Sequence, residues 1–373
     1  MVLQGIQFLP VTVNRDQALN LFKILADVNK KLGILSSELE HSIANENLMQ
    51  VFSLIESTQS TRIEGTQVTF TEVLEEKGSK NHSSEIKEVL NYQEALSEGI
   101  EKLRGGYPLS TRLMKDLHKI LMDGSRGTSS GSGEFRKIQN HIGPDNKIEN
   151  AVYVPVPPNV VNEYMTNLEY FINNEAHRTF REIEDENLYV FDESTPDLIK
   201  AGIIHAQFES IHPFIDGNGR LGRILIILTL LKEKAISKPI FFVSEELEKE
   251  RARYYDLLNG VRGSDPEWYP WLKFFLESSL RMIENLLKKI RESEQLARSG
   301  AKKLKGKEVQ VWLFSFTQPT FKVIDAANYL GLSPKTVREK LSKLVDLELL
   351  YTDKVTKRNK QYHNYDFLRI LNQ

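Results

Sequence analysis

Apolar side chains recur at helical spacing through most of the first 290 residues. Between Ala18 and Leu32 they return every three or four positions, which predicts a helix that Gly33 stops. The same spacing predicts further helices over about residues 45–63, 84–103, 113–121, 159–176 and 197–212. Residues 224–231 form the longest apolar run, which indicates a buried helix and is far too short to span a bilayer.

Strand signals are few in this part of the chain. One hairpin is predicted, with arms near residues 138–142 and 151–154 and a turn at residues 143–146. Residues 124–133 contain four glycines and four serines, which predicts a mobile loop, and residues 177–195 form a polar, acidic insertion.

The pattern changes after residue 307. An apolar stretch, Val309 to Phe316, is followed by a segment, Phe321 to Arg338, that predicts a helix, a glycine-containing turn and a second helix over 334–345. A hairpin from Leu349 to Tyr362, turning at residues 357–360, would complete a winged helix-turn-helix. We therefore predict a mainly α protein with four parts: a helical region at 1–104, a core at 105–290, a linker or helix extension at 291–307, and a winged helix at 308–373.

Charge separates the last part from the rest. The whole chain carries a net charge of −2, but residues 301–373 hold 14 Lys and Arg against 7 Asp and Glu, which is +7, and leave about −9 elsewhere. Lys335, Arg338 and Lys343 lie on the second predicted helix of the winged segment. This excess favours contact with DNA phosphates, while a winged helix used for protein contacts or dimerisation is the alternative.

Composition excludes several kinds of chemistry. The chain has no cysteine, so disulfides, thiolate zinc sites and cysteine nucleophiles are excluded. The eight histidines form no HExxH cluster, which disfavours a zinc enzyme, and no GxxxxGK[ST] motif indicates a P-loop. Residues 1–10 lack the basic start and apolar core of a signal peptide, so we expect a cytoplasmic location.

The richest chemistry lies in residues 212–223, which read HPFIDGNGRLGR immediately before the longest apolar run. Gly217 and Gly219 can take positive φ, so this turn at a helix N-terminus can present backbone N–H groups to an anion such as phosphate. Arg220 and Arg223 share one face of the helix and suit phosphate oxygens. Asp216 is a hard oxygen ligand for Mg²⁺, and His212 can accept a proton from a hydroxyl near neutral pH.

The stretch resembles the Fic-domain signature H-x-F-x-D-G-N-G-R-x-x-R and matches it at every signature position. The resemblance implies a transferase that moves AMP from ATP to a protein hydroxyl and releases pyrophosphate. It implies that His212 is the general base and that Asp216 holds Mg²⁺. It also implies an ATP site formed by Gly217, Asn218, Gly219, Arg220, Leu221, Gly222 and Arg223, with Arg223 on the γ-phosphate.

A second element resembles the inhibitory motif of the same family, [S/T]-x-x-x-E-[G/N]. It reads STRIEG, from Ser60 to Gly65, at the end of the helix predicted over 45–63. The resemblance implies that Glu64 pairs with Arg223 and competes with the γ-phosphate. Without residues 212–223, a solvated helix face would be the better explanation of this hexapeptide.

Two further site assignments rest on position in the family pattern. The hairpin would be a flap over the site, with Asn150, Ala151, Val152 and Tyr153 lining the nucleotide and a target segment docking as an added strand. Tyr254 would contact the adenine side, although a packing aromatic is an alternative. His205, two turns before His212, is expected to pack inside the protein.

The sequence therefore predicts a self-inhibited protein adenylyltransferase that uses ATP and Mg²⁺. Expected partners are a target protein docked by the flap, the chain itself as a substrate, a second copy in a homodimer, and DNA or protein at the winged helix, with no membrane. The competing class is a DNA-binding regulator whose core only senses nucleotide. Within enzymes, removal of AMP or transfer of another phosphate-containing group stays open.

Overall fold

The computed structural model describes residues 2–76, 82–124, 131–144, 147–177, 185–353 and 360–373. The chain divides into two compact units. The first comprises residues 1–31, 56–67 and 83–282, and the second comprises 32–55, 68–82 and 283–373. The boundaries fall inside three long helices: α1 (Arg15–Glu40), α2 (Asn45–Ile63) and α11 (Trp268–Ala301).

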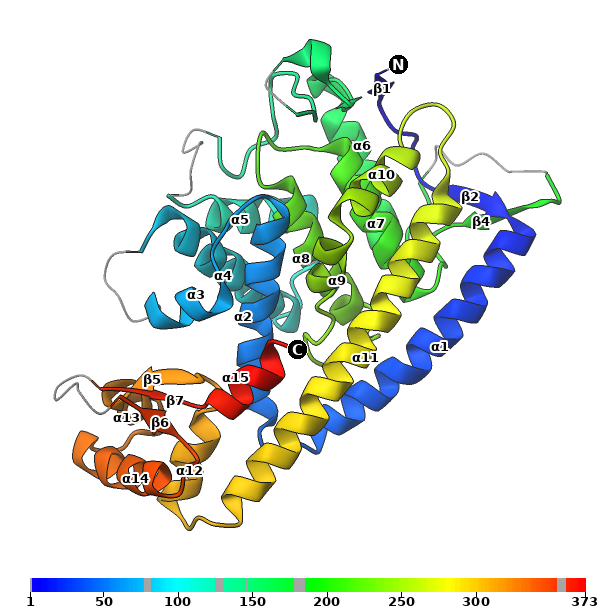
Figure 1. Cartoon of the computed structure of the whole chain (residues 1–373). Helices are drawn as coiled ribbons and strands as arrows, with labels where there is room; N and C mark the ends of the chain where they lie inside the picture. The colour runs from blue at the N-terminus through cyan, green and yellow to red at the C-terminus, as the bar shows by residue number, and fades with distance from the viewer. Residues whose placement is uncertain (1, 77–81, 125–130, 145–146, 178–184, 354–359) are drawn as a thin grey trace. The chain divides into compact units, whose positions relative to one another are not determined.

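The first unit is built around two consecutive helices, α7 (Asp197–Ile211) and α8 (Asn218–Lys232), which pack against each other (Figure 1). Nearly every side chain of α7 is buried, and so is the apolar run of α8 that includes Ile224 and Leu230. A helix that is apolar on all sides must be covered on all sides. Helix α6 (Val161–Ile172) covers α7, and helices α4 (Ser84–Arg104) and α5 (Thr111–Leu121) cover α8.

Side-chain caps mark the starts of two helices in this unit. The hydroxyls of Ser83 and Ser110 accept hydrogen bonds from the third backbone N–H of α4 and α5, the usual arrangement of an N-cap. The predicted helices at 45–63, 84–103, 113–121 and 197–212 are confirmed, and the one at 159–176 is shorter, preceded by a 3₁₀ turn at Pro158–Val160. The unit also contains α9 (Ser244–Lys249), α10 (Arg251–Gly260) and the first parts of α1 and α11.

The predicted stop at Gly33 is wrong, because α1 runs on to Glu40. Leu32, Leu35 and Leu39 continue the buried stripe beyond the glycine, and nothing lies within 4 Å of the position that a Cβ on Gly33 would take. Burial of that stripe outweighs the roughly 1 kcal/mol that a glycine costs inside a helix. Of the two alternatives for residues 291–307, the helix extension holds through Ala301.

The strands of the first unit are short. Strand β2 (Val11–Asn14) pairs antiparallel with β4 (Leu188–Phe191), and β1 (Leu3–Gln4) pairs parallel with β3 (Tyr153–Val154). The predicted hairpin is reduced to one antiparallel bridge between Ile142 and Tyr153, so its first arm is not a strand. The second arm pairs instead with the start of the chain, a contact that local sequence cannot reveal. Turn residues 145–146, most of the predicted loop at 124–133, and residues 178–184 of the acidic insertion lie outside the described residues.

The second unit ends with a small mixed module. Helix α12 (Lys307–Phe314) is followed by β5 (Thr320–Lys322), α13 (Val323–Leu330), α14 (Pro334–Asp346), β6 (Tyr351–Thr352), β7 (Gln361–His363) and α15 (Tyr365–Leu371). The strands form an antiparallel sheet in the order β5-β7-β6. The predicted turn and helix are present, with Gly331 in the left-handed conformation after α13. Residues 357–359 of the predicted hairpin turn lie outside the described residues, and the winged-helix assignment stays a prediction.

Helix α3 (Phe70–Glu76) also belongs to the second unit, where it contacts β5. Among the described residues, no helix is both long enough and apolar enough to cross a membrane.

Candidate functional site

The loop between the two buried helices, residues 212–217, turns the chain through two left-handed residues. His212 ends α7 with φ 49° and ψ 60°, and Gly217 precedes α8 with φ 77°. Positive φ is open to glycine but costs a residue with a Cβ, so the His212 backbone is held in place by its surroundings. The loop thus brings the C-terminal end of α7, whose last carbonyls have no helical partners, close to the N-terminal end of α8, whose first N–H groups have none either.

The His212 side chain has a defined tautomer. Its Nδ1 lies 3.2 Å from the backbone oxygen of Glu209, and because a carbonyl can only accept, Nδ1 carries the proton. Burial lowers the pKa of His212 to about 4, and the guanidinium groups of Arg262 and Arg136 act in the same direction. The imidazole is therefore neutral at pH 7, with the Nε2 lone pair available to accept a proton.

The start of α8 presents donors for an anion. The backbone N–H groups of Asn218, Gly219 and Arg220 precede the first bond within the helix, which Leu221 donates to Gly217. The Asn218 side chain bonds both polar groups of Phe214, at 2.9 Å in each direction, so it braces the loop from inside. The expected phosphate contact is therefore left to the backbone amides, which the helix dipole makes a site for negative charge.

Arg220 is a buried cation with incomplete partners. It is 4% exposed, and its guanidinium lies 3.7 Å from Asp216 Oδ1 and 4.0 Å from Glu88 Oε2. Its Nε and Nη1 make no hydrogen bond among the described residues. A buried N–H group without an acceptor is costly, so this guanidinium is suited to an anionic ligand at the helix start.

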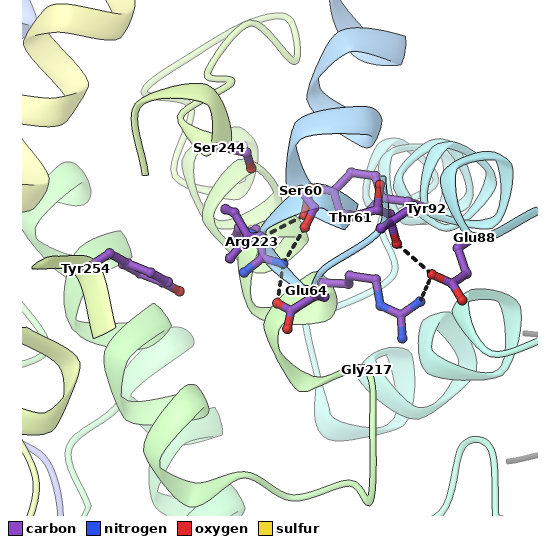
Figure 2. A network of polar contacts seen from close by, with 12 residues as sticks. Ser60, Thr61, Glu64, Glu88, Tyr92, Gly217, Arg223, Ser244 and Tyr254 are labelled. Atoms are coloured by element: carbon purple, nitrogen blue, oxygen red, sulfur yellow. Dashed lines mark hydrogen bonds and ion pairs between the residues drawn. The ribbon is translucent and has the colours of Figure 1, made fainter. Parts of the chain in front are cut away.

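Two nitrogens of the Arg223 guanidinium bond the end of α2, as Figure 2 shows, while its Nη1 has no hydrogen-bond partner among the described residues. Its Nε donates to the Ser60 hydroxyl at 2.7 Å, and its Nη2 donates to the Ser60 carbonyl at 2.8 Å and to Glu64 Oε1 at 2.6 Å. Burial acts to raise the pKa of Glu64, but Arg223, with Arg220 and His212, holds that pKa below its ordinary value. The carboxylate is thus ionised and neutralises a buried guanidinium.

The Glu64 carboxylate occupies the space directly over the start of α8. A Cβ added at Gly219 would lie 2.0 Å from Glu64 Oε1, so only glycine permits this approach. Gly65 follows with φ 98°, which lets the chain turn away after α2 ends. The structure therefore brings Ser60, Glu64, Arg223 and the glycine turn into one site.

Asp216 stands at the edge of this site with half of its side chain exposed. One oxygen accepts the Gly217 N–H at 2.6 Å, which leaves the other oxygen for a ligand. Among the described residues, no group of three or more His, Asp or Glu could hold a metal on its own. A single carboxylate still fits Mg²⁺, which commonly binds one or two carboxylates together with substrate phosphates and water.

The remaining predicted site residues differ in exposure. Val152 is exposed, whereas Ala151 and Tyr153 are buried, and Asn150 ends a 3₁₀ turn at Ile148–Asn150. Tyr254 is fully buried, and its hydroxyl bonds His205 Nε2 at 2.8 Å, so in this arrangement its ring packs inside the protein. His205 is buried, as expected. The nucleotide contacts assigned to these residues stay predictions.

Two buried carboxyl groups behind Arg223 were not anticipated from the sequence. Glu56, on α2, is bonded by the Tyr92 hydroxyl and by the backbone and hydroxyl of Ser244, and burial raises its pKa to about 7. Glu209 is 6% exposed, and burial raises its pKa to about 7 as well. Glu209 Oε1 has no hydrogen-bond partner among the described residues, which is tolerable for a protonated carboxyl and costly for a charged one. Neither group belongs to a sequence motif, so local sequence gave no signal for them.

Comparison with known proteins agrees with this geometry. Residues 108–230 match the model of the Fic/DOC family, and residues 22–101 match the model of the Fic/DOC family N-terminal region. The chain is 25% identical over 181 residues to protein adenylyltransferase fic-1 of Caenorhabditis elegans, covering 48% of this chain and 30% of that protein. It is 62% identical over 37 residues to a Fido domain-containing protein of Dictyostelium discoideum, covering 10% of this chain and 25% of that one.

Solved structures show the same fold at low identity. A Fic family protein from Desulfovibrio desulfuricans is 20% identical with a TM-score of 0.54, covering 92% of this chain and 95% of that one. A fragment of Fic-1 from Caenorhabditis elegans is 18% identical with a TM-score of 0.52, covering 74% of each chain. The matches span only about a quarter to a third of the curated adenylyltransferases' length.

The buried carboxyl Glu209 predicts a measurable pH dependence of stability. Its pKa is higher in the folded than in the unfolded protein, so the folded state binds more protons between about pH 4.5 and 7. The free energy of unfolding therefore falls as pH rises through that window. In Glu209→Gln we expect this fall to be smaller by roughly 1 to 3 kcal/mol, measured by denaturant unfolding at pH 5 and pH 7.5. Identical falls in the parent and the variant would show that Glu209 ionises normally.

Proposed function

Because the chain belongs to the Fic/DOC family, we propose that it is a protein adenylyltransferase that transfers AMP from ATP to a Ser, Thr or Tyr hydroxyl. The names of the relatives support this kind of transfer. The observation that carries the proposal is the junction of α7 and α8, where a neutral imidazole, a helix N-terminus and two buried guanidinium groups converge. The target protein is expected to dock beside residues 150–153, and the chain itself is a second expected target.

In the proposed reaction, the hydroxyl oxygen of the target attacks the α-phosphorus of ATP. The bond from the α-phosphorus to the bridging oxygen breaks, and pyrophosphate leaves. His212 Nε2 takes the hydroxyl proton, because Nδ1 already carries a proton and donates a hydrogen bond to the backbone oxygen of Glu209. A base that is neutral at pH 7 is ready for this step without first losing a proton.

The phosphates would be held by the N–H groups of residues 218–220, by the unsatisfied donors of Arg220, and by Arg223. Such fixed donors stabilise negative charge that develops in phosphoryl-type transfer. Asp216 would hold Mg²⁺, which supplies neutralisation of the phosphate charge when it is bound. The orientation of the reacting groups is then set by rigid backbone at the start of α8.

The proposed activity is restrained by Glu64. Its carboxylate occupies Arg223 and the space over Gly219, the place at which the γ-phosphate would lie. A carboxylate and a phosphate cannot both take the same guanidinium donors, so Glu64 must move before ATP binds productively. The bond from Arg223 to the Ser60 hydroxyl holds this end of α2 against the site.

This competition predicts the effect of removing the carboxylate. In Glu64→Gly, we expect labelling of the protein by α-³²P-ATP in the presence of Mg²⁺ to rise about 10- to 100-fold. This factor corresponds to the free energy of one charge-assisted hydrogen bond. Ser60→Ala keeps the carboxylate but loses one anchor, so its labelling rises roughly 3- to 10-fold. The readout is radioactivity in the protein band after a fixed time.

The double variant Glu64→Gly/His212→Ala is the control. It should bind ATP as tightly as Glu64→Gly but transfer no AMP, because only the proton acceptor is missing. Transfer at the rate of Glu64→Gly would contradict the role of His212. An unlabelled Glu64→Gly protein that still binds ATP would favour a nucleotide sensor, AMP removal, or transfer of another group.

A second role is proposed for the module at residues 307–373. Helix α14 exposes Lys335 and Arg338 on one face, and Lys343 farther along is paired with Glu308. Together with the charge of +7 in residues 301–373, these cations support contact with DNA phosphates. Contact with a protein, including a second copy in a homodimer, is the alternative use of the same face.

DNA contact predicts a salt-dependent affinity of the full chain for random duplex DNA. Replacing both exposed cations, in Lys335→Glu/Arg338→Glu, is expected to weaken binding at low salt by at least tenfold and to reduce its salt dependence. Fluorescence anisotropy of a labelled duplex at two salt concentrations measures both effects. Absence of binding by the parent at low salt would rule out DNA and favour the protein contact.

A further inference from the structure

The end of α7 is held by three side chains that lie outside residues 212–223. Tyr153 donates its hydroxyl to the backbone oxygen of Ser210 at 2.6 Å. Arg136 donates from Nε to the oxygen of His212 at 2.9 Å and from Nη2 to the oxygen of Ile211 at 3.4 Å.

The third side chain, Arg262, completes the set. Its Nη2 donates to the backbone oxygen of Glu209 at 3.4 Å, and its Nε donates to the Ser210 hydroxyl at 3.2 Å. The four backbone oxygens from Glu209 to His212, which a helix end leaves without helical partners, thus all accept side-chain bonds.

These three side chains form one buried collar. Arg136 is 3% exposed, Arg262 is 5% exposed and Tyr153 is fully buried. The Arg262 guanidinium lies 4.2 Å from the centre of the Tyr153 ring, and Arg136 also donates to the Val156 oxygen. The collar is therefore continuous, and it joins segments that are more than a hundred residues apart in the chain.

The choice of two cations is the unusual feature. Among the described residues, neither Arg136 nor Arg262 makes an ion pair with a carboxylate, although burying a guanidinium without a counter-charge is costly. The negative end of the α7 dipole and its carbonyls offset part of that cost. Neutral donors would satisfy the same carbonyls, so the positive charge calls for a further reason. Arg136 binds the backbone oxygen of His212, and both guanidinium groups act on the His212 imidazole.

We propose that Arg136, Tyr153 and Arg262 are positioning residues for the reaction of His212. They hold its backbone in the left-handed conformation and aim Nε2 at the incoming hydroxyl. The inference rests on the proposed transfer of AMP. Both guanidinium groups also lower the pKa of His212, in addition to burial, so the collar keeps the imidazole unprotonated as well as oriented.

Charge and geometry can be separated by two substitutions at one position. Arg136→Lys keeps a cation but loses the fork that reaches two carbonyls, whereas Arg136→Gln loses the charge as well. Both are placed in the Glu64→Gly background, and AMP transfer is measured with varied ATP, together with an NMR titration of the ¹³C-labelled histidines. Tyr153→Phe removes only one hydroxyl and is therefore the mildest change to the collar, so it still tests the proposal if the arginine variants fail to fold. Arg112→Gln, at an exposed position, is the matched control.

We expect Arg136→Lys to lower kcat roughly 10- to 100-fold with unchanged KM for ATP and an unchanged His212 titration. Arg136→Gln and Arg262→Gln should lower kcat further and raise the pKa of His212 towards 6.5. Tyr153→Phe should lower kcat several-fold, and Arg112→Gln should match the parent. A merely structural collar would change thermal stability in these variants without moving the His212 titration.

Parental kcat in Arg136→Lys and Tyr153→Phe, or a His212 titration unmoved in both glutamine variants, would overturn the proposal. Failure of the proposed function would look different, because the Glu64→Gly parent would itself transfer no AMP. In that case the titration alone decides: a raised His212 pKa in Arg136→Gln and Arg262→Gln supports the collar, and an unmoved one refutes it.

Discussion

Two helix ends meet at residues 212–217, and each leaves backbone groups without helical partners. The end of α7 is met by donors from Arg136, Tyr153 and Arg262, and the loop is braced by Asn218. The start of α8 keeps its N–H groups directed at the site. The asymmetry has a chemical consequence: the carbonyl end is closed by the protein, and the amide end stays available to an anion.

Buried charge is the second constraint. Arg223 is 1% exposed, and its ionised partner is Glu64. Glu64 directly follows α2 and lies 159 residues before Arg223 in the chain. The two carboxyls behind it, Glu56 and Glu209, have raised pKa values and are largely protonated below pH 7. Arg223 therefore depends on a negative group at the front of the site, which Glu64 supplies in this structure.

Sequence reasoning succeeded where the signal was local. Residues 212–223 hold a proline, three glycines and two arginines before an apolar run, and the structure has the predicted helix, turn and helix there. The Ser110 cap and the helix over 45–63 followed from the same kind of local evidence. The resemblance to the Fic family added the link between Ser60-Gly65 and Arg223, which periodicity alone does not contain.

The sequence by itself determined most of the helical pattern, the turn at residues 212–217 and the chemistry of its side chains, because these depend on neighbours within a few residues. Tertiary structure decided that α1 passes through Gly33, that Tyr153 pairs with the start of the chain, and that Tyr254 packs on His205. It also decided that Arg136 and Arg262 close the end of α7. Each of these depends on which distant segment buries a given surface or carbonyl, and no short stretch of sequence carries that information.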